Sequence, residues 1–128
     1  MTISEIGDLA KEIPTRVSQI IEIANKGFGL IQRLLRLSAL DLDIYYKIVE
    51  TTAIVCEFWG NLEQVWRYFI VKVQPDEEKL KILDNLKDLT ASIYQIVLEE
   101  QTSNLREREI LTLIQQYFED LTAQLHLM

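Results

Sequence analysis

Glycine and proline, the residues that normally mark turns and strand ends, are nearly missing from this chain. There are four glycines and two prolines in 128 residues, and neither type occurs from Asp76 to Met128. Apolar residues recur instead every three or four positions, which is the period of a helix with one apolar side. The sequence therefore predicts an all-α protein.

Two helices are predicted in the C-terminal half. The first spans residues 76–100, because Pro75 favours a helix start and the acidic residues after it suit the positive end of a helix dipole. The second is predicted to begin at Asn104, since Asn104 and Glu107 have the spacing of a capping box. Its apolar residues recur as far as Leu125.

Residues 41–73 are predicted to form one long central helix. Eight of the nine residues at two heptad positions are apolar, and further apolar neighbours widen this stripe. The opposite side is acidic and polar, and Gly60 falls toward it, where a glycine need not break the helix. We expect these side chains to be largely buried: Tyr45, Ile48, Val55, Trp59, Leu62, Trp66 and Phe69.

The N-terminal third keeps the same three-four alternation from Ile3 to Leu34 without a slip. A loop would normally reset this register, so we favour one helix over residues 14–37, preceded by a short helix over 3–13. Gly27 and Gly29 leave the alternative of a turn, which would make two helices of residues 14–40. Four long helices with short connectors predict an up-down-up-down four-helix bundle with a short N-terminal helical extension, in a single domain over 1–128.

The amino-acid composition limits the classes of function that this chain can have. With 48% apolar and 26% charged residues the chain is typical of a folded globular protein, and its net charge of −7 argues against nucleic-acid binding. The one cysteine, Cys56, cannot form an internal disulfide and is expected to be a buried, inert thiol. The acidic N-terminus does not resemble a signal peptide, and no apolar run is long enough to span a membrane. We expect a soluble cytoplasmic protein.

Enzymatic chemistry is not indicated. The only histidine, His126, lacks a glutamate three residues before it, so the ligand set of a di-iron or di-manganese bundle is missing. Glu63 interrupts the apolar flank of the long helix, but Arg67 stands at the favourable spacing for an ion pair. No phosphate-binding loop is present. We expect no catalytic residue, metal or cofactor.

Apolar residues also occur on sides of the helices that a four-helix core does not need. Three of them are tyrosines, a residue type enriched in interface cores. They predict a surface for a second copy of the chain or for a larger protein, with burial inside the monomer as the alternative. The candidate interface residues are Tyr46, Ile54, Tyr68, Val71, Leu80, Tyr94 and Leu98.

Residues 23–40 contain three basic residues and no acidic one, which is unusual in so acidic a chain. Within them, segment 26–37 resembles a basic amphipathic helix that lies on a membrane surface, with Lys26, Phe28, Arg33 and Arg36 as the candidate contacts. The simpler interpretation is a core helix with three solvated basic residues. The sequence therefore predicts a non-enzymatic, self-associating interaction module, with a membrane-active bundle as the alternative.

Overall fold

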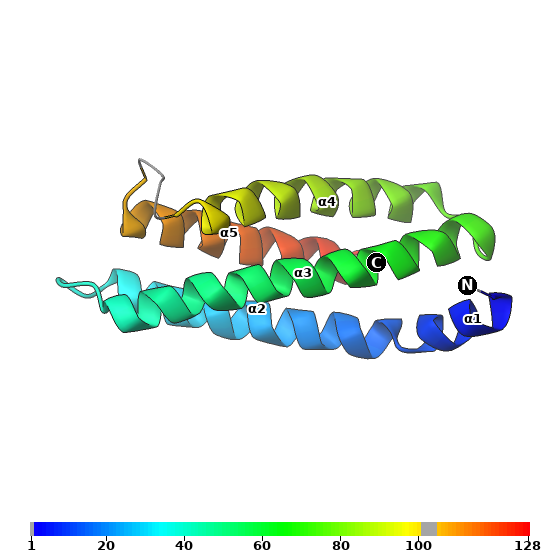
Figure 1. Ribbon diagram of the computed structural model, residues 1–128, viewed down its shortest axis with the longest axis horizontal. Coiled ribbons are helices and arrows are strands. Elements are labelled where there is room, and N and C mark those ends of the chain that lie inside the picture. Colours follow the sequence, from blue (N-terminus) through cyan, green and yellow to red (C-terminus); the bar gives the residue numbers. More distant parts are fainter. Residues whose placement is uncertain (1, 101–104) are drawn as a thin grey trace.

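The chain is described here by a computed structural model, which covers residues 2–100 and 105–128. These residues form five helices packed together and contain no strand. In Figure 1 the four longer helices lie side by side along the long axis of the molecule, and the first continues from the N-terminal end of the second. The helices are α1 (Ile3–Lys11), α2 (Ile13–Leu35), α3 (Leu42–Lys72), α4 (Glu77–Leu98) and α5 (Glu107–His126).

Side-chain caps explain where α3 and α4 begin. The Asp41 carboxylate accepts hydrogen bonds from the backbone N–H groups of Asp43 (3.1 Å) and Ile44 (3.2 Å). Asp76 accepts one from the N–H of Lys79, at 3.1 Å. Each carboxylate satisfies donors of the first helical turn and carries negative charge at the positive end of the helix dipole.

The predicted start of the last helix was wrong. The N-cap of α5 is Arg106, and it makes no side-chain capping bond to a described residue. Glu107 is therefore the first helical residue, whereas a capping box with Asn104 would need it at the third position. Asn104 itself lies outside the described residues.

The helix α2 is continuous through both glycines, so the predicted single helix is confirmed. No described glycine has a positive φ angle, and the chain therefore does not turn at Gly27 or Gly29. The two glycines have different surroundings. A Cβ atom added to Gly27 would lie 2.6 Å from Cε2 of Phe118 on α5, whereas one added to Gly29 would meet no described atom within 4 Å.

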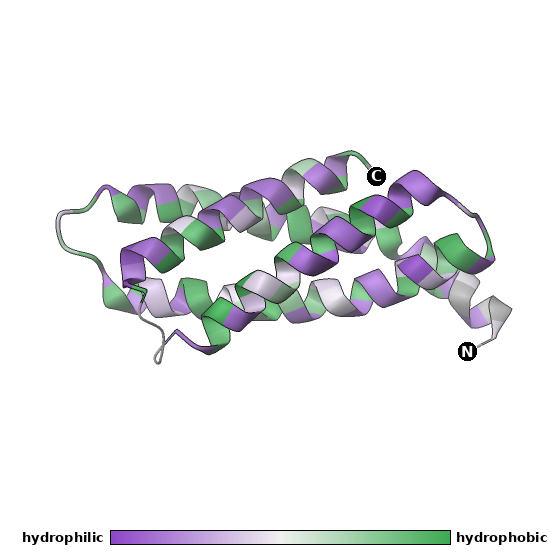
Figure 2. Cartoon of the chain, turned by 90° about the horizontal axis from the view of Figure 1, so that it is seen from above, coloured by the Kyte–Doolittle hydropathy of each residue, from purple (hydrophilic) through white to green (hydrophobic). Residues whose placement is uncertain are grey.

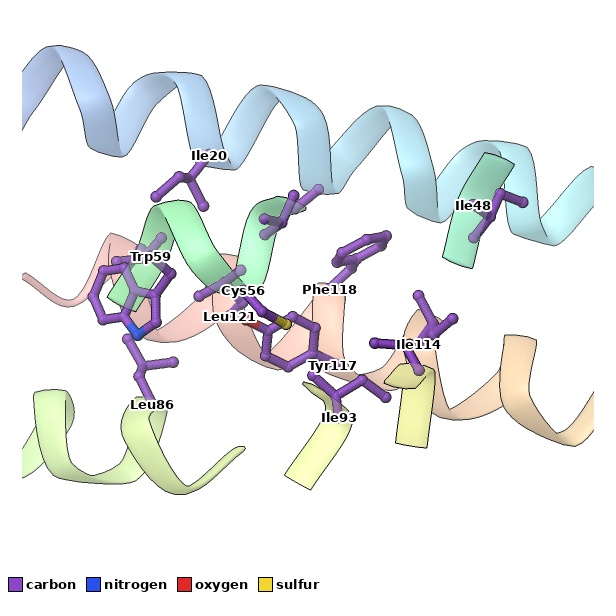
Figure 3. Close-up of a cluster of buried hydrophobic side chains, with 14 of the residues drawn as sticks. Ile20, Ile48, Cys56, Trp59, Leu86, Ile93, Ile114, Tyr117, Phe118 and Leu121 are labelled. Carbon is purple, nitrogen blue, oxygen red and sulfur yellow. The ribbon is translucent and has the colours of Figure 1, made fainter. Parts of the chain in front are cut away.

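The buried residues of α3 follow the predicted apolar stripe, except near the C-terminal end of the helix. Tyr45, Trp59 and Leu62 are almost completely buried, as predicted. Phe69 is only half-buried, and its neighbour Ile70 occupies the core instead. A straight helix drifts by about 20° per heptad, so a heptad pattern that faces the core near residue 45 has rotated away from it near residue 70. Figure 3 shows part of this core, with the indole of Trp59 reaching toward Leu86 of α4.

Three hydroxyl groups in the core are hydrogen-bonded. The hydroxyl groups of Thr90 and Tyr117 lie 2.9 Å apart, and the Thr52 hydroxyl donates to the Ile48 carbonyl at 2.7 Å. Cys56 is buried beside Tyr117, as Figure 3 shows, and burial raises the pKa of its thiol to about 11. A thiol with this pKa is protonated at neutral pH, which agrees with the predicted inert cysteine.

Helix packing joins segments far apart in the sequence. α2 packs against α3 and α5, α4 packs against α3 and α5, and α1 packs against α2 and α3. Figure 2 shows apolar and polar segments alternating along the four longer helices, as expected where each buries one side. Arg108 of α5 donates to the carbonyl oxygens of Leu35 (3.1 Å) and Leu37 (2.7 Å), at the end of α2.

Arg108→Ala is expected to lower the free energy of unfolding by about 1–2 kcal/mol, because it removes charged donors from carbonyls that the helix end leaves without intrahelical partners. Urea unfolding followed by circular dichroism measures the change. Arg106→Ala, at the exposed N-cap of the same helix, is the matched control and is expected to change stability by less than about 0.5 kcal/mol. Equal effects of the two substitutions would show that the contact with α2 contributes nothing.

Candidate interaction surface

Four of the predicted interface residues lie on one outward side of α3. At 3.6 residues per turn they fall within an arc of about 100°. Their exposed fractions range from 43% for Tyr68 to 57% for Ile54, with Tyr46 and Val71 between them. Exposed polar residues share this side, so the apolar residues are spread along α3 instead of forming a continuous strip. These polar residues are Glu50, Glu57, Asn61 and Gln64.

The three predicted interface residues of α4 differ in exposure. Leu98 is 62% exposed. Leu80 and Tyr94 are half-buried and pack against the core, so they offer less free surface. The Tyr94 hydroxyl donates to Glu57 of α3 at 2.8 Å, and this hydrogen bond to a carboxylate raises the pKa of Tyr94.

One end of the molecule carries several exposed apolar residues together. The α2–α3 connection and the C-terminal end of α4 both lie at this end, as Figure 1 shows. The Tyr45 hydroxyl donates to Glu100 at 3.2 Å, which holds the start of α3 beside the end of α4. The exposed apolar residues at this end are Leu37, Leu42, Tyr46 and Leu98.

Segment 26–37 forms the last turns of α2 and the two residues after it, and it divides into two sides. Lys26 is exposed and pairs with Glu22 at 2.8 Å, while Arg33 and Arg36 are also exposed. Phe28 is half-buried against the core, and Ile31 and Leu34 are buried in it. In the folded protein the basic side chains thus face solvent, while Phe28, Ile31 and Leu34 are used for packing and Leu37 is exposed.

An apolar groove between α2 and α3 was not predicted from the sequence. It consists of two adjoining hollows of about 210 and 290 Å³, both lined by Ile23 and Lys26. Ile54 and Phe58 of α3 line the larger one, so the most exposed of the four α3 interface residues stands at its edge. Only the three-dimensional packing of α2 and α3 reveals this groove, because its lining residues are ordinary helix positions.

The predicted Glu63–Arg67 ion pair is confirmed, with Nε and Oε1 2.5 Å apart. Arg67 also lies 2.8 Å from the carboxylate of Asp84 on α4, a partner that sequence spacing does not reveal. Within residues 2–100 and 105–128, no three His, Cys, Asp or Glu side chains are grouped to hold a metal ion. In the same residues, no helix combines the length and the apolar character needed to cross a membrane.

Comparison with known proteins finds no matching protein family, no matching curated protein and no matching solved structure.

Proposed function

We propose that this protein is a non-enzymatic helical interaction module that pairs with a second copy of itself through the outer sides of α3 and α4. Ile54 carries the proposal: its side chain is 57% exposed near the middle of α3, and it lines an apolar hollow with Ile23 and Phe58. An exposed apolar patch on a small protein commonly marks a contact site. The acidic composition and the single buried cysteine support action in the cytoplasm.

The scaffold of this module is, in our proposal, an up-down-up-down four-helix bundle of α2–α5 with α1 as its extension. Two long-range contacts support it. Arg108 places the start of α5 at the end of α2, and Tyr45 places the start of α3 at the end of α4. Each contact is that of an antiparallel pair, and short connections between neighbouring helices favour the same arrangement.

A dimer with two-fold symmetry is the simplest arrangement that buries these outer sides. Cyclic dimers are the commonest closed assemblies, and each copy presents the same surface to the other. Burial of roughly 1,600 Å² in total is ordinary for a stable pair. Tyr46, Ile54, Tyr68 and Val71 on α3, together with Leu98 on α4, supply the exposed apolar part of that area.

Analytical ultracentrifugation tests the proposal. We expect a dimer at micromolar concentration, and we expect Ile54→Glu or Tyr68→Glu to give a folded monomer, because a carboxylate buried in an apolar contact is costly. Leu113→Glu is the control, since Leu113 is similarly exposed but lies on α5. A wild-type monomer at all concentrations, or a dimer lost equally in the control, would refute this pairing, and docking onto a larger protein would then be the better hypothesis.

The membrane-active alternative receives less support. Its apolar contacts would come from segment 26–37, where Ile31 and Leu34 are buried against the other helices. Membrane insertion would therefore require α2 to leave the core. Sedimentation with anionic lipid vesicles distinguishes the two functions, and we expect the folded protein to remain unbound.

A further inference from the structure

The smaller hollow of the α2–α3 groove, of about 210 Å³, has a floor that comes from a third helix. Figure 3 shows the Phe118 ring reaching from α5 toward α2. The ring fits there because Gly27 has no side chain, and a Cβ atom would lie 2.6 Å from Cε2 of the ring. Ile23, which is 40% exposed, and Leu30 belong to the α2 wall, and Ile48 belongs to the α3 wall. The hollow is therefore mostly apolar and open to solvent.

Two lysines, one on each wall, are the only charged residues of the described chain that line this hollow. Lys26 belongs to α2 and Lys47 to α3, and both are exposed. Lys47 is the only basic residue within positions 42–66, where the sequence has four acidic residues. In a chain of net charge −7, two basic residues thus meet at one apolar hollow, which we call the lysine hollow.

The charges at the lysine hollow leave an excess of one positive charge. Asp43 stands four residues before Lys47, the favourable order for an ion pair on a helix, yet Lys47 forms no ion pair with a described residue. Lys26 pairs with Glu22 at 2.8 Å. Two positive charges and one negative charge give +1, and the two lysines repel each other unless an anion lies between them. A monovalent anion neutralises this excess.

The lysine hollow lies outside the contact proposed for self-association. None of the exposed apolar residues proposed for that contact lines it, and Ile54 lines only the larger hollow of the groove. At 3.6 residues per turn, Thr51 of the lysine hollow points about 140° away from Tyr46 and about 100° away from Tyr68 around α3. A second copy bound to the outer sides of α3 and α4 therefore leaves the lysine hollow accessible.

We propose that the lysine hollow binds a short-chain alkyl carboxylate, which is a small monovalent anion with an apolar body. The carboxylate lies between the ammonium groups of Lys26 and Lys47, and the chain covers Ile23, Leu30 and the Phe118 ring. Small-molecule sites commonly combine an apolar lining with a few charged or polar groups. A helix of a partner protein, about 10–12 Å in diameter with its side chains, is too wide for this hollow.

Sodium hexanoate is a suitable probe, because it joins one carboxylate to a short alkyl chain. Nitrogen-15 NMR of the full chain follows the backbone N–H signals of Gly27 and Thr51, one on each wall. We expect saturable shifts with a Kd of about 1 mM, in keeping with a ligand of so few atoms. The N–H signal of Leu113, which does not line the hollow, is the internal control. Absence of a saturable shift at Gly27 and Thr51 would overturn the proposal.

Two related compounds test the two halves of the ligand. Hexanamide keeps the chain but has a neutral head group, and we expect it to bind about fivefold more weakly because it cannot pair with the lysines. Acetate keeps the carboxylate without the chain, and we expect no saturable shift. Equal binding of hexanoate and hexanamide would refute recognition of the anion, and equal binding of hexanoate and acetate would refute the apolar contact.

Substitutions on both walls test the position of the site. Lys26→Gln and Lys47→Gln are each expected to weaken binding about threefold, as for the loss of an exposed ion pair, while Lys81→Gln on α4 is the control. Thr51→Phe fills the hollow and is expected to abolish the shift at Gly27, whereas Thr112→Phe, at an exposed threonine of α5, leaves it unchanged. Circular dichroism verifies that the variants fold. Binding that persists in Thr51→Phe, or that is unchanged in both glutamine variants of the hollow, would overturn the proposal.

The titration is repeated in Ile54→Glu, so that this proposal and the proposed self-association fail separately. Unchanged binding is expected whatever the oligomeric state, because Ile54 does not line the lysine hollow. Loss of binding in this variant would place the probe at the self-association contact and refute the site. A wild-type monomer that binds hexanoate as described would support the site and refute only the pairing.

Discussion

Trp59→Ala is expected to lower the free energy of unfolding by about 3–5 kcal/mol, the largest effect that we predict for a single substitution. The side chain is 1% exposed and contacts Trp66 edge to face, with ring centroids 6.4 Å apart. Its removal leaves a cavity at the centre of the α3–α4 contact, and the surrounding helices fill such a cavity only partly. Chemical unfolding followed by far-UV circular dichroism measures the loss.

Trp59→Phe is the matched control. It keeps an aromatic ring in the core and removes the indole N–H, which has no partner among the described residues, so its cost is expected to be clearly smaller than that of the alanine substitution. Tryptophan fluorescence gives an independent check, because both tryptophans are buried. Solvent-exposed emission from both of them, or a loss below about 1 kcal/mol for Trp59→Ala, would contradict this core.

Gly27→Leu is expected to cost about 3 kcal/mol through overpacking. Even a Cβ atom at this position would lie 2.6 Å from Cε2 and 3.0 Å from Cδ2 of Phe118. Phe118 is 1% exposed, so its ring has little room to move aside. The substitution therefore forces α2 and α5 apart, and thermal unfolding is expected to show a lower midpoint.

Gly29→Ala is the companion experiment on the same helix. Its new methyl group meets no described atom within 4 Å, and alanine favours the helix by up to about 1 kcal/mol over glycine. We expect a neutral or mildly stabilising effect. If Gly29→Ala were the more damaging of the two changes, the continuous helix α2 would be wrong and a turn at Gly29 would be the better description.

The sequence predicts the helices well because each carries its own periodic signal. The bounds of α2, α3 and α4 lie within two residues of the predicted ones, and the different surroundings of Gly27 and Gly29 follow from the register of α2. Ion pairs within one helix can also be predicted from the sequence. The Glu63–Arg67 pair is an example, because both partners lie on α3. Sequence spacing suffices wherever the interacting groups belong to the same helix.

Contacts between residues on different helices could not be predicted from sequence spacing. Asp84 and Arg108 resemble ordinary surface charges until the fold brings them to Arg67 and to the end of α2. Gly60 was placed on the outer side, and only the position of α4 makes it the wall of a hollow. The predicted burial of Phe69 was wrong because a strict heptad pattern takes no account of the gradual rotation of its residues around a straight helix.

The contacts between α2 and α5 have a consequence for the order in which the molecule is assembled. The groups that Arg108 joins are 73 and 71 residues apart in the sequence, and Phe118 reaches Gly27 from even further along the chain. At 5–20 residues per second a ribosome needs roughly 4–15 s to make a stretch of this length. For that time the part of α2 that packs against α5 is completed but uncovered. A neighbouring nascent chain can then supply its own α5, so crowded synthesis on one messenger favours exchange of this helix between copies.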